Sequence, residues 1–90
     1  MVIGIELSRE FITDLLEKMG DDGDPAAFLV GRPGERRRLS RDCYAPIAAR
    51  LRELTEGTEG WDDSRASRLA AMLESVSQPE NTNEIELRFT

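Results

Sequence analysis

The sequence predicts a small single-domain α+β protein, a two-layer sandwich in which about three helices cover one face of a sheet. Apolar and polar residues alternate at both ends of the 90-residue chain, over residues 1–7 and 83–90, which is the period of a half-buried strand. In three segments between them, apolar residues recur every three to four positions, as in an amphipathic helix. The resulting order β-α-β-(β)-α-α-β predicts a mixed or antiparallel sheet of three or four strands.

The two terminal strands have matching patterns, so we expect them to be neighbours in one sheet. Their apolar side chains share one face, formed by Ile3, Ile5, Leu7, Ile85, Leu87 and Phe89. Their opposite faces are mostly polar, which indicates that helices cover only one side of the sheet.

The first helix is predicted between two capping residues. Ser8 is a favourable N-cap, and Gly20 suits the C-terminal end. The apolar stripe between them consists of Phe11, Ile12, Leu15, Leu16 and Met19.

A hairpin is predicted after the first helix. Residues 26–30 form a short apolar run that is compatible with a buried strand. Pro33 and Gly34 occupy the central positions of a type II turn. Residues 36–40 would then return as an edge strand protected by its own charges.

Two further helices are predicted before the last strand. One begins at Asp42 or Cys43, with Pro46 tolerated in its first turn. The other is capped by Asp62 and ends before Pro79. Their apolar stripes consist of Ile47, Ala48, Leu51 and Leu54, and of Ala66, Leu69, Ala70, Leu73 and Val76.

The composition removes several classes of function. The chain has no histidine and one cysteine, so a zinc site, a Ser-His-Asp triad or a Cys-His pair would be incomplete. We therefore expect no catalytic residue, no metal and no cofactor, and a protein that is not an enzyme. The chain also lacks a bilayer-spanning apolar run, a signal-peptide pattern and a second cysteine, so we expect a cytoplasmic protein without a membrane partner.

The net charge of -6 is unevenly distributed, and its acidic part predicts a partner-binding surface. Acidic residues lie on or just after the polar side of the first helix, and such a concentration steers a basic partner. A surface selected only for solubility is the open alternative. Trp61 is a candidate anchor for a partner or a cover for one end of the core. The candidate binding residues are Glu10, Asp14, Glu17, Asp21, Asp22, Asp24 and Trp61.

Five arginines form a second candidate site, a basic patch within residues 32–41, where one acid accompanies them. They are Arg32, Arg36, Arg37, Arg38 and Arg41, and they could contact phosphate. Only Tyr44 supplies a nearby aromatic ring, and the whole chain is acidic, so nucleic acid is not the favoured partner. A solvated strand edge, or pairing with the chain's own acids, is the simpler interpretation.

The closing helix and strand, residues 64–89, are similar in outline to barstar-type inhibitors, as are the chain length and acidic balance. In that family an acidic helix plugs a basic active site. The family's aromatic-rich central helix has no match here, so no functional residue is carried over. The resemblance implies a small acidic protein that binds another protein.

The favoured hypothesis is a regulator, inhibitor or immunity-type module that associates non-covalently with a partner protein, and a homodimer is also open. The alternatives are a nucleic-acid or nucleotide accessory module that uses the basic patch, and a small carboxylate-dependent enzyme or enzyme subunit.

Overall fold

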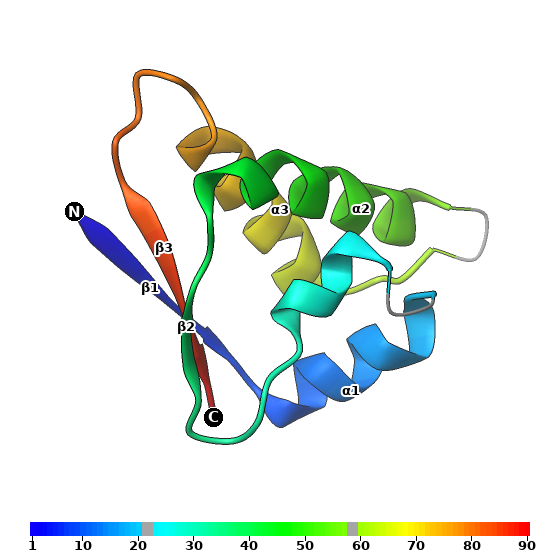
Figure 1. Ribbon diagram of the computed structural model, residues 1–90. Coiled ribbons are helices and arrows are strands. Elements are labelled where there is room, and N and C mark those ends of the chain that lie inside the picture. Colours follow the sequence, from blue (N-terminus) through cyan, green and yellow to red (C-terminus); the bar gives the residue numbers. More distant parts are fainter. Residues whose placement is uncertain (21–22, 58–59) are drawn as a thin grey trace.

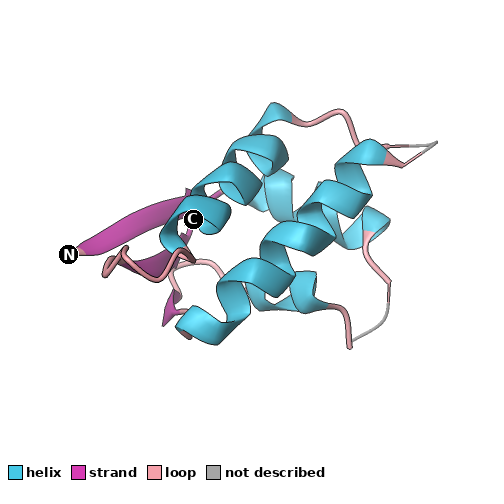
Figure 2. Cartoon of the chain, turned by 90° about the horizontal axis from the view of Figure 1, so that it is seen from above, coloured by secondary structure: helices cyan, strands magenta, loops and turns pink. Residues whose placement is uncertain are grey.

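The computed structural model describes residues 1–20, 23–57 and 60–90, which form a three-stranded mixed sheet and three α-helices (Figure 1). The elements are β1 (Val2–Leu7), α1 (Arg9–Lys18), η1 (Pro25–Leu29), β2 (Arg36–Arg38), η2 (Arg41–Cys43), α2 (Tyr44–Glu56), α3 (Ser64–Val76) and β3 (Glu84–Phe89), where η denotes a 3-10 helix. The helices lie together on one side of the sheet (Figure 2). The predicted α+β class is therefore confirmed. No helix in these ranges has the length and apolar character needed to cross a membrane.

β3 is the central strand of the sheet, whose order is β1-β3-β2. It pairs in parallel with β1 and antiparallel with β2, so Ile5 and Arg37 both lie opposite Leu87. The expectation that the first and last strands are neighbours is confirmed. The apolar faces of β1 and β3 point toward the helices, where Leu87 is fully buried.

α1 begins after Ser8, as the sequence predicts. Fewer of its apolar residues are buried than expected. The Ser8 hydroxyl accepts a hydrogen bond from the amide of Phe11 at 3.2 Å, which satisfies a free donor of the first turn. Leu16 is 51% exposed, so it lies outside the buried stripe. Met19, rather than Gly20, ends the helix by donating its amide hydrogen to the carbonyl of Leu15.

The predicted buried strand at residues 26–30 is wrong, because Pro25–Leu29 form the 3-10 helix η1. Asp24 caps this helix by accepting the amide hydrogen of Ala26 at 2.9 Å, and Pro25 stands at its first position. Phe28 consequently faces solvent and is 48% exposed.

The predicted turn exists, although the strand that follows it has another partner. The amide of Glu35 donates to the carbonyl of Arg32 at 3.0 Å, and Gly34 has a φ of 84°, as a type II turn requires. β2 then pairs with β3, whereas the predicted hairpin would have paired it with residues 26–30. β2 is a three-residue strand at the sheet edge.

α2 and α3 pack over the sheet, and Tyr44 connects α2 to it. All five residues of the predicted α3 stripe are buried. The cap of α3 is Asp63 rather than Asp62, since the Asp63 carboxylate accepts the amide hydrogen of Arg65 at 2.9 Å. The buried Tyr44 hydroxyl accepts from the amide of Ile85 at 2.8 Å and donates to the carbonyl of Leu39. Tyr44 thereby binds a β3 amide just past the end of β2.

Candidate functional site

The predicted acidic residues occupy different environments. Glu10 and Glu17 are exposed on α1, and in the described part of the chain no hydrogen bond or ion pair holds either carboxylate. Asp14 is partly exposed, with a carboxylate oxygen 3.6 Å from the Arg65 guanidinium. Asp21 and Asp22 lie outside the described residues.

Asp24 belongs to the interior, and its carboxylate joins three parts of the fold. Its side chain is 4% exposed and accepts the amide hydrogens of Gly20 at 3.0 Å and Ala26 at 2.9 Å. Nε of Arg50 on α2 lies 2.8 Å from the same carboxylate. Burial by itself raises the pKa of Asp24, but the two amide donors and Arg50 together lower this pKa below its ordinary value. Asp24 thus links the end of α1, the start of η1 and α2.

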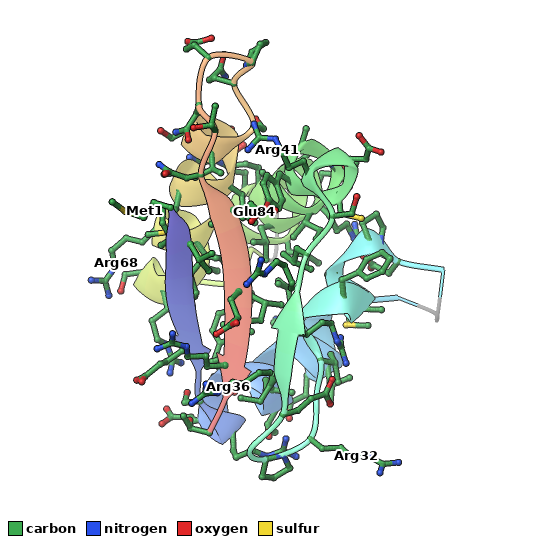
Figure 3. The ribbon with its side chains drawn as sticks, turned by 60° about the vertical axis from the view of Figure 1, so that its left-hand side comes forward. Met1, Arg32, Arg36, Arg41, Arg68 and Glu84 are labelled. Carbon is green, nitrogen blue, oxygen red and sulfur yellow. The ribbon has the colours of Figure 1, made fainter. Side chains whose placement is uncertain are left out.

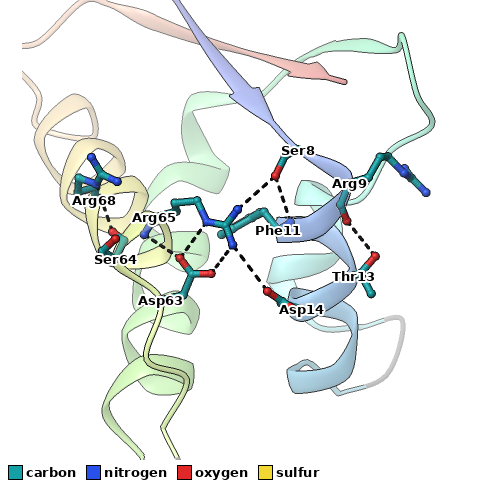
Figure 4. A network of polar contacts seen from close by, with 9 residues as sticks. All are labelled: Ser8, Arg9, Phe11, Thr13, Asp14, Asp63, Ser64, Arg65 and Arg68. Atoms are coloured by element: carbon teal, nitrogen blue, oxygen red, sulfur yellow. Dashed lines mark hydrogen bonds and ion pairs between the residues drawn. The ribbon is translucent and has the colours of Figure 1, made fainter.

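Arg65 connects the start of α3 to the start of α1 (Figure 4). Its Nη2 lies 2.7 Å from Asp63 and 3.6 Å from Asp14, and its Nη1 donates to the Ser8 hydroxyl at 3.3 Å. The guanidinium also lies over the ring of Phe11, 5.5 Å from its centroid. The hydrogen bond from Arg65 lowers the pKa of Asp63, although burial opposes this shift. The network holds the two helix starts in a defined relative position.

Arg65 brings Asp14 of α1 close to Asp63 before α3, although these acids are far apart in the sequence. We call acidic surface the group formed by Glu10, Asp14, Glu17, Asp62 and Asp63. Asp14 and Asp63 share Arg65 as an ion-pair partner, while Asp62 is exposed and, among the described residues, has no hydrogen bond or ion pair. Sequence reasoning missed Asp62 and Asp63 as members, because no local pattern indicates that the α2–α3 connection packs beside α1.

Trp61 lies beside the acidic surface and packs mainly into the core. Its ring centroid is 5.3 Å from that of Phe11, and the residue is only 8% exposed. Its amide donates to the carbonyl of Leu54 at 2.8 Å. One edge of Trp61 lines a hollow of about 460 Å³ next to Asp62 and Asp63. It therefore offers a partner little area, and its predicted role as an anchor stays a prediction.

Arg37 in the predicted basic patch is occupied by contacts within the protein. Its Nη1 donates to the carbonyls of Phe28 at 2.9 Å and Val30 at 3.1 Å. Its guanidinium pairs with Glu35 at 2.6 Å and lies over the ring of Phe89, 5.3 Å from the centroid. In a strand, the carbonyls of residues 26–30 would have bonded to a neighbouring strand. Here the Arg37 side chain provides the hydrogen-bond donors for two of them.

Arg41 is likewise occupied, at the end of α3. Its guanidinium donates to the carbonyl of Val76 at 3.0 Å and to those of Gln78, Asn81 and Asn83. It therefore binds the free carbonyls that follow the helix and holds the loop leading into β3.

The remaining arginines of the patch, Arg32, Arg36 and Arg38, are exposed, and Figure 3 shows Arg32 extending into solvent at the turn before β2. Arg38 pairs with Glu84 at 3.2 Å. Within the described residues, the guanidinium groups of Arg32 and Arg36 have no hydrogen bond or ion pair. The structure thus divides the basic patch and leaves two of its five side chains unengaged.

A groove of about 560 Å³ runs between β1 and α3. Its apolar lining consists of Ile5, Leu7, Phe11, Leu69 and Met72, and its charged lining of Glu6, Arg65 and Arg68. Sequence reasoning did not identify this groove, because β1 and α3 are separated by more than half of the chain.

In the three described ranges, no group of three or more His, Cys, Asp or Glu side chains is placed to hold a metal ion. Comparison with protein-family models, curated proteins and solved structures finds no match to this chain. The function is therefore inferred from the geometry.

Proposed function

We propose that the protein binds another protein non-covalently through the acidic surface and regulates or inhibits a partner that presents basic residues. The observation that carries this proposal is the joining of acids from α1 and from the start of α3 around one arginine. Five carboxylates share this surface, and Arg65 is the one arginine paired with its members in the described residues. Repulsion among them is relieved when a basic partner approaches, which favours fast association.

The Arg65 network supports the proposal because it places the acids on elements that are held together. Glu10, Glu17 and Asp62 are exposed, while Arg65 connects the two helix starts through Ser8 and Asp63. Binding groups on a rigid scaffold lose less conformational entropy when a partner binds.

The contacts of the arginines favour a protein partner over a nucleic acid. Arg37 and Arg41 donate to backbone carbonyls, and Arg38 pairs with a carboxylate, so these three side chains are already engaged. A phosphate backbone would have to compete with these contacts.

The test compares the protein with two variants that lose equal charge. In the first, Glu10→Gln, Glu17→Gln and Asp62→Asn remove three exposed carboxylates from the acidic surface. In the control, Asp42→Asn, Glu53→Gln and Glu80→Gln remove three exposed carboxylates elsewhere. Each is used to capture partners from a lysate, and the captured partner is then purified for rate measurements.

We expect the unchanged protein and the control to capture the same basic partner, and the first variant to associate with it about tenfold more slowly at low salt. Its association rate should also depend less steeply on salt concentration. Equal rates and equal salt dependence for both variants would show that the acidic surface is not the binding surface.

A further inference from the structure

Among the described residues, the outer edge of β1 has no partner strand, so its backbone groups are unpaired there. The carbonyls of Met1 and Leu7 accept the amide hydrogens of Glu84 and Thr90 at 2.9 and 3.1 Å, so the odd-numbered residues of β1 direct their backbone toward β3. The backbone N–H and C=O groups of Val2, Gly4 and Glu6 therefore point away from the sheet. An edge of this length is a template for another strand.

Apolar side chains gather along this same edge. Five large hydrophobic residues of the described chain are exposed, and three of them lie here: Met1 at 88%, Val2 at 41% and Met72 at 40%. Figure 3 shows Met1 and Arg68 beside the free edge of β1, with α3 behind it. The groove of about 560 Å³ adds an apolar floor next to the strand. The edge thus combines unpaired backbone with apolar surface, and Glu6 is the one charged side chain of β1.

The charges at this edge are balanced, unlike those of the protein as a whole. Among the described residues, Glu6 has no ion-pair partner, and Arg68 has a hydrogen bond only to the carbonyl of Ser64. Arg65 is already paired with Asp63, and Arg88, whose guanidinium lies against Gly4, is already paired with Glu86. Two copies that each carry a net charge of -6 repel one another over most surfaces, and a balanced edge permits close approach.

We propose that β1 pairs antiparallel with β1 of a second copy of this chain, with Gly4 opposite Gly4 at the two-fold axis. A two-fold interface must be complementary to itself. An edge whose backbone donors and acceptors alternate, and whose charged side chains balance, fulfils this condition. In this register Val2 of each copy lies opposite Glu6 of the other, and three residue pairs each exchange two hydrogen bonds. The sheet becomes a continuous sheet of six strands, and the proposal does not depend on the acidic surface.

The register gives a charge-swap test by sedimentation equilibrium over a range of protein concentrations. Val2→Glu places a carboxylate opposite Glu6 of the other copy, twice per dimer, and should weaken the dimer about tenfold. The double variant Val2→Glu with Glu6→Lys places opposite charges there and should recover the affinity. The recovery cannot arise within one copy, because Glu84 is opposite position 2 and Arg88 is opposite position 6.

Phe28→Glu, at another exposed apolar residue, serves as the matched control and should leave the dimer unchanged. Circular dichroism verifies that each variant is folded. Hydrogen exchange adds a direct readout: the amides of Val2, Gly4 and Glu6 should slow as concentration rises, while those of Ile3 and Ile5 should not change.

A monomer at every concentration overturns the proposal, and so does a dimer that Val2→Glu leaves unchanged. A dimer that Val2→Glu weakens, and that the double variant does not restore, contradicts the proposed register. A monomer whose β1 amides slow only when a different protein is added would assign the edge to that protein instead.

Discussion

The acidic residues of α1 and the arginines of residues 32–41 have opposite charges, and the structure uses them in opposite ways. Arg37 and Arg41 donate to backbone carbonyls around η1 and after α3, whereas Glu10 and Glu17 remain exposed on the polar side of α1. The carbonyls at a helix end need donors, and a guanidinium supplies five of them. Glu10 and Glu17 lie near the two ends of α1, and in the described residues neither carboxylate accepts a hydrogen bond from a backbone amide. A high density of charged residues therefore does not by itself identify a binding surface. Charged side chains that lie close to unpaired backbone groups form hydrogen bonds within the protein instead.

Asp24 is the exception among the predicted acids, and its removal should have the largest effect. Asp24→Ala leaves the partly buried Arg50 with only the exposed Glu53 as an ion-pair partner, and it leaves two amides without an acceptor. We expect a loss of about 3 kcal/mol in the free energy of unfolding, measured with a denaturant. Glu17→Ala, on the exposed side of α1, should change it by at most about 0.5 kcal/mol. Similar losses of unfolding free energy for the two variants would show that Asp24 is no more important for stability than an exposed acid of α1.

Arg41 provides the next largest test, within the basic patch. Arg41→Ala frees several carbonyls after α3, and we expect it to reduce the free energy of unfolding by about 2 kcal/mol. Arg41→Lys should restore only part of this, because an ammonium cannot reproduce the planar fork of donors. Arg36→Ala should change stability by at most about 0.5 kcal/mol. If Arg36→Ala is as costly as Arg41→Ala, the arginines are not divided as the contacts indicate.

Asp24 and Asp63 should also make stability depend on pH. Asp24 and Asp63 have lowered pKa values in the folded protein, so folding favours their ionised forms. Their contribution is fully present above the unfolded carboxyl pKa of about 4 and is lost as pH falls through the folded pKa. We expect the free energy of unfolding to decrease as the pH is lowered below about 4, with a shallower decrease for Asp24→Asn. Equal pH profiles for the two proteins would contradict the role assigned to Asp24.

The exposed acids should give the smallest effect on stability. Glu10→Gln with Glu17→Gln removes like charges that have no partner in the described structure, so the free energy of unfolding should stay within about 0.5 kcal/mol or rise slightly. Any increase should diminish at high salt, because salt screens the repulsion. Thermal unfolding at two salt concentrations measures this, and a loss above about 1 kcal/mol would show that these acids support the fold.

Strong periodicity allowed five elements to be predicted from the sequence. The alternation in β1 and β3 and the apolar stripes of α1, α2 and α3 each place one apolar face toward the core. The pairing of β1 with β3 also followed, because both strands present matching faces to one helical layer.

The prediction from sequence was wrong where a run of apolar residues had neither the period of a strand nor that of a helix. Residues 26–30 could have been a strand or a helical turn, and the start signal of Asp24 and Pro25 was the one indication of η1. The partner of β2 was not predictable either, because its three arginines carry no apolar alternation, and pairing with β3 depends on where the chain returns after the Arg32–Glu35 turn.

The sequence by itself thus determined the fold class, the terminal strands and the buried faces of the helices, because these depend on periods read within single segments. Only the tertiary structure decided which charges are internal. Arg41 meets carbonyls about 40 residues away, and Asp14 meets Asp63 at Arg65. It also decided that β1 has a free edge beside an apolar groove, since that depends on the order of strands and the position of α3. The physical reason is that hydrogen bonds and ion pairs act over a few ångströms between groups that the fold, rather than the local sequence, brings together.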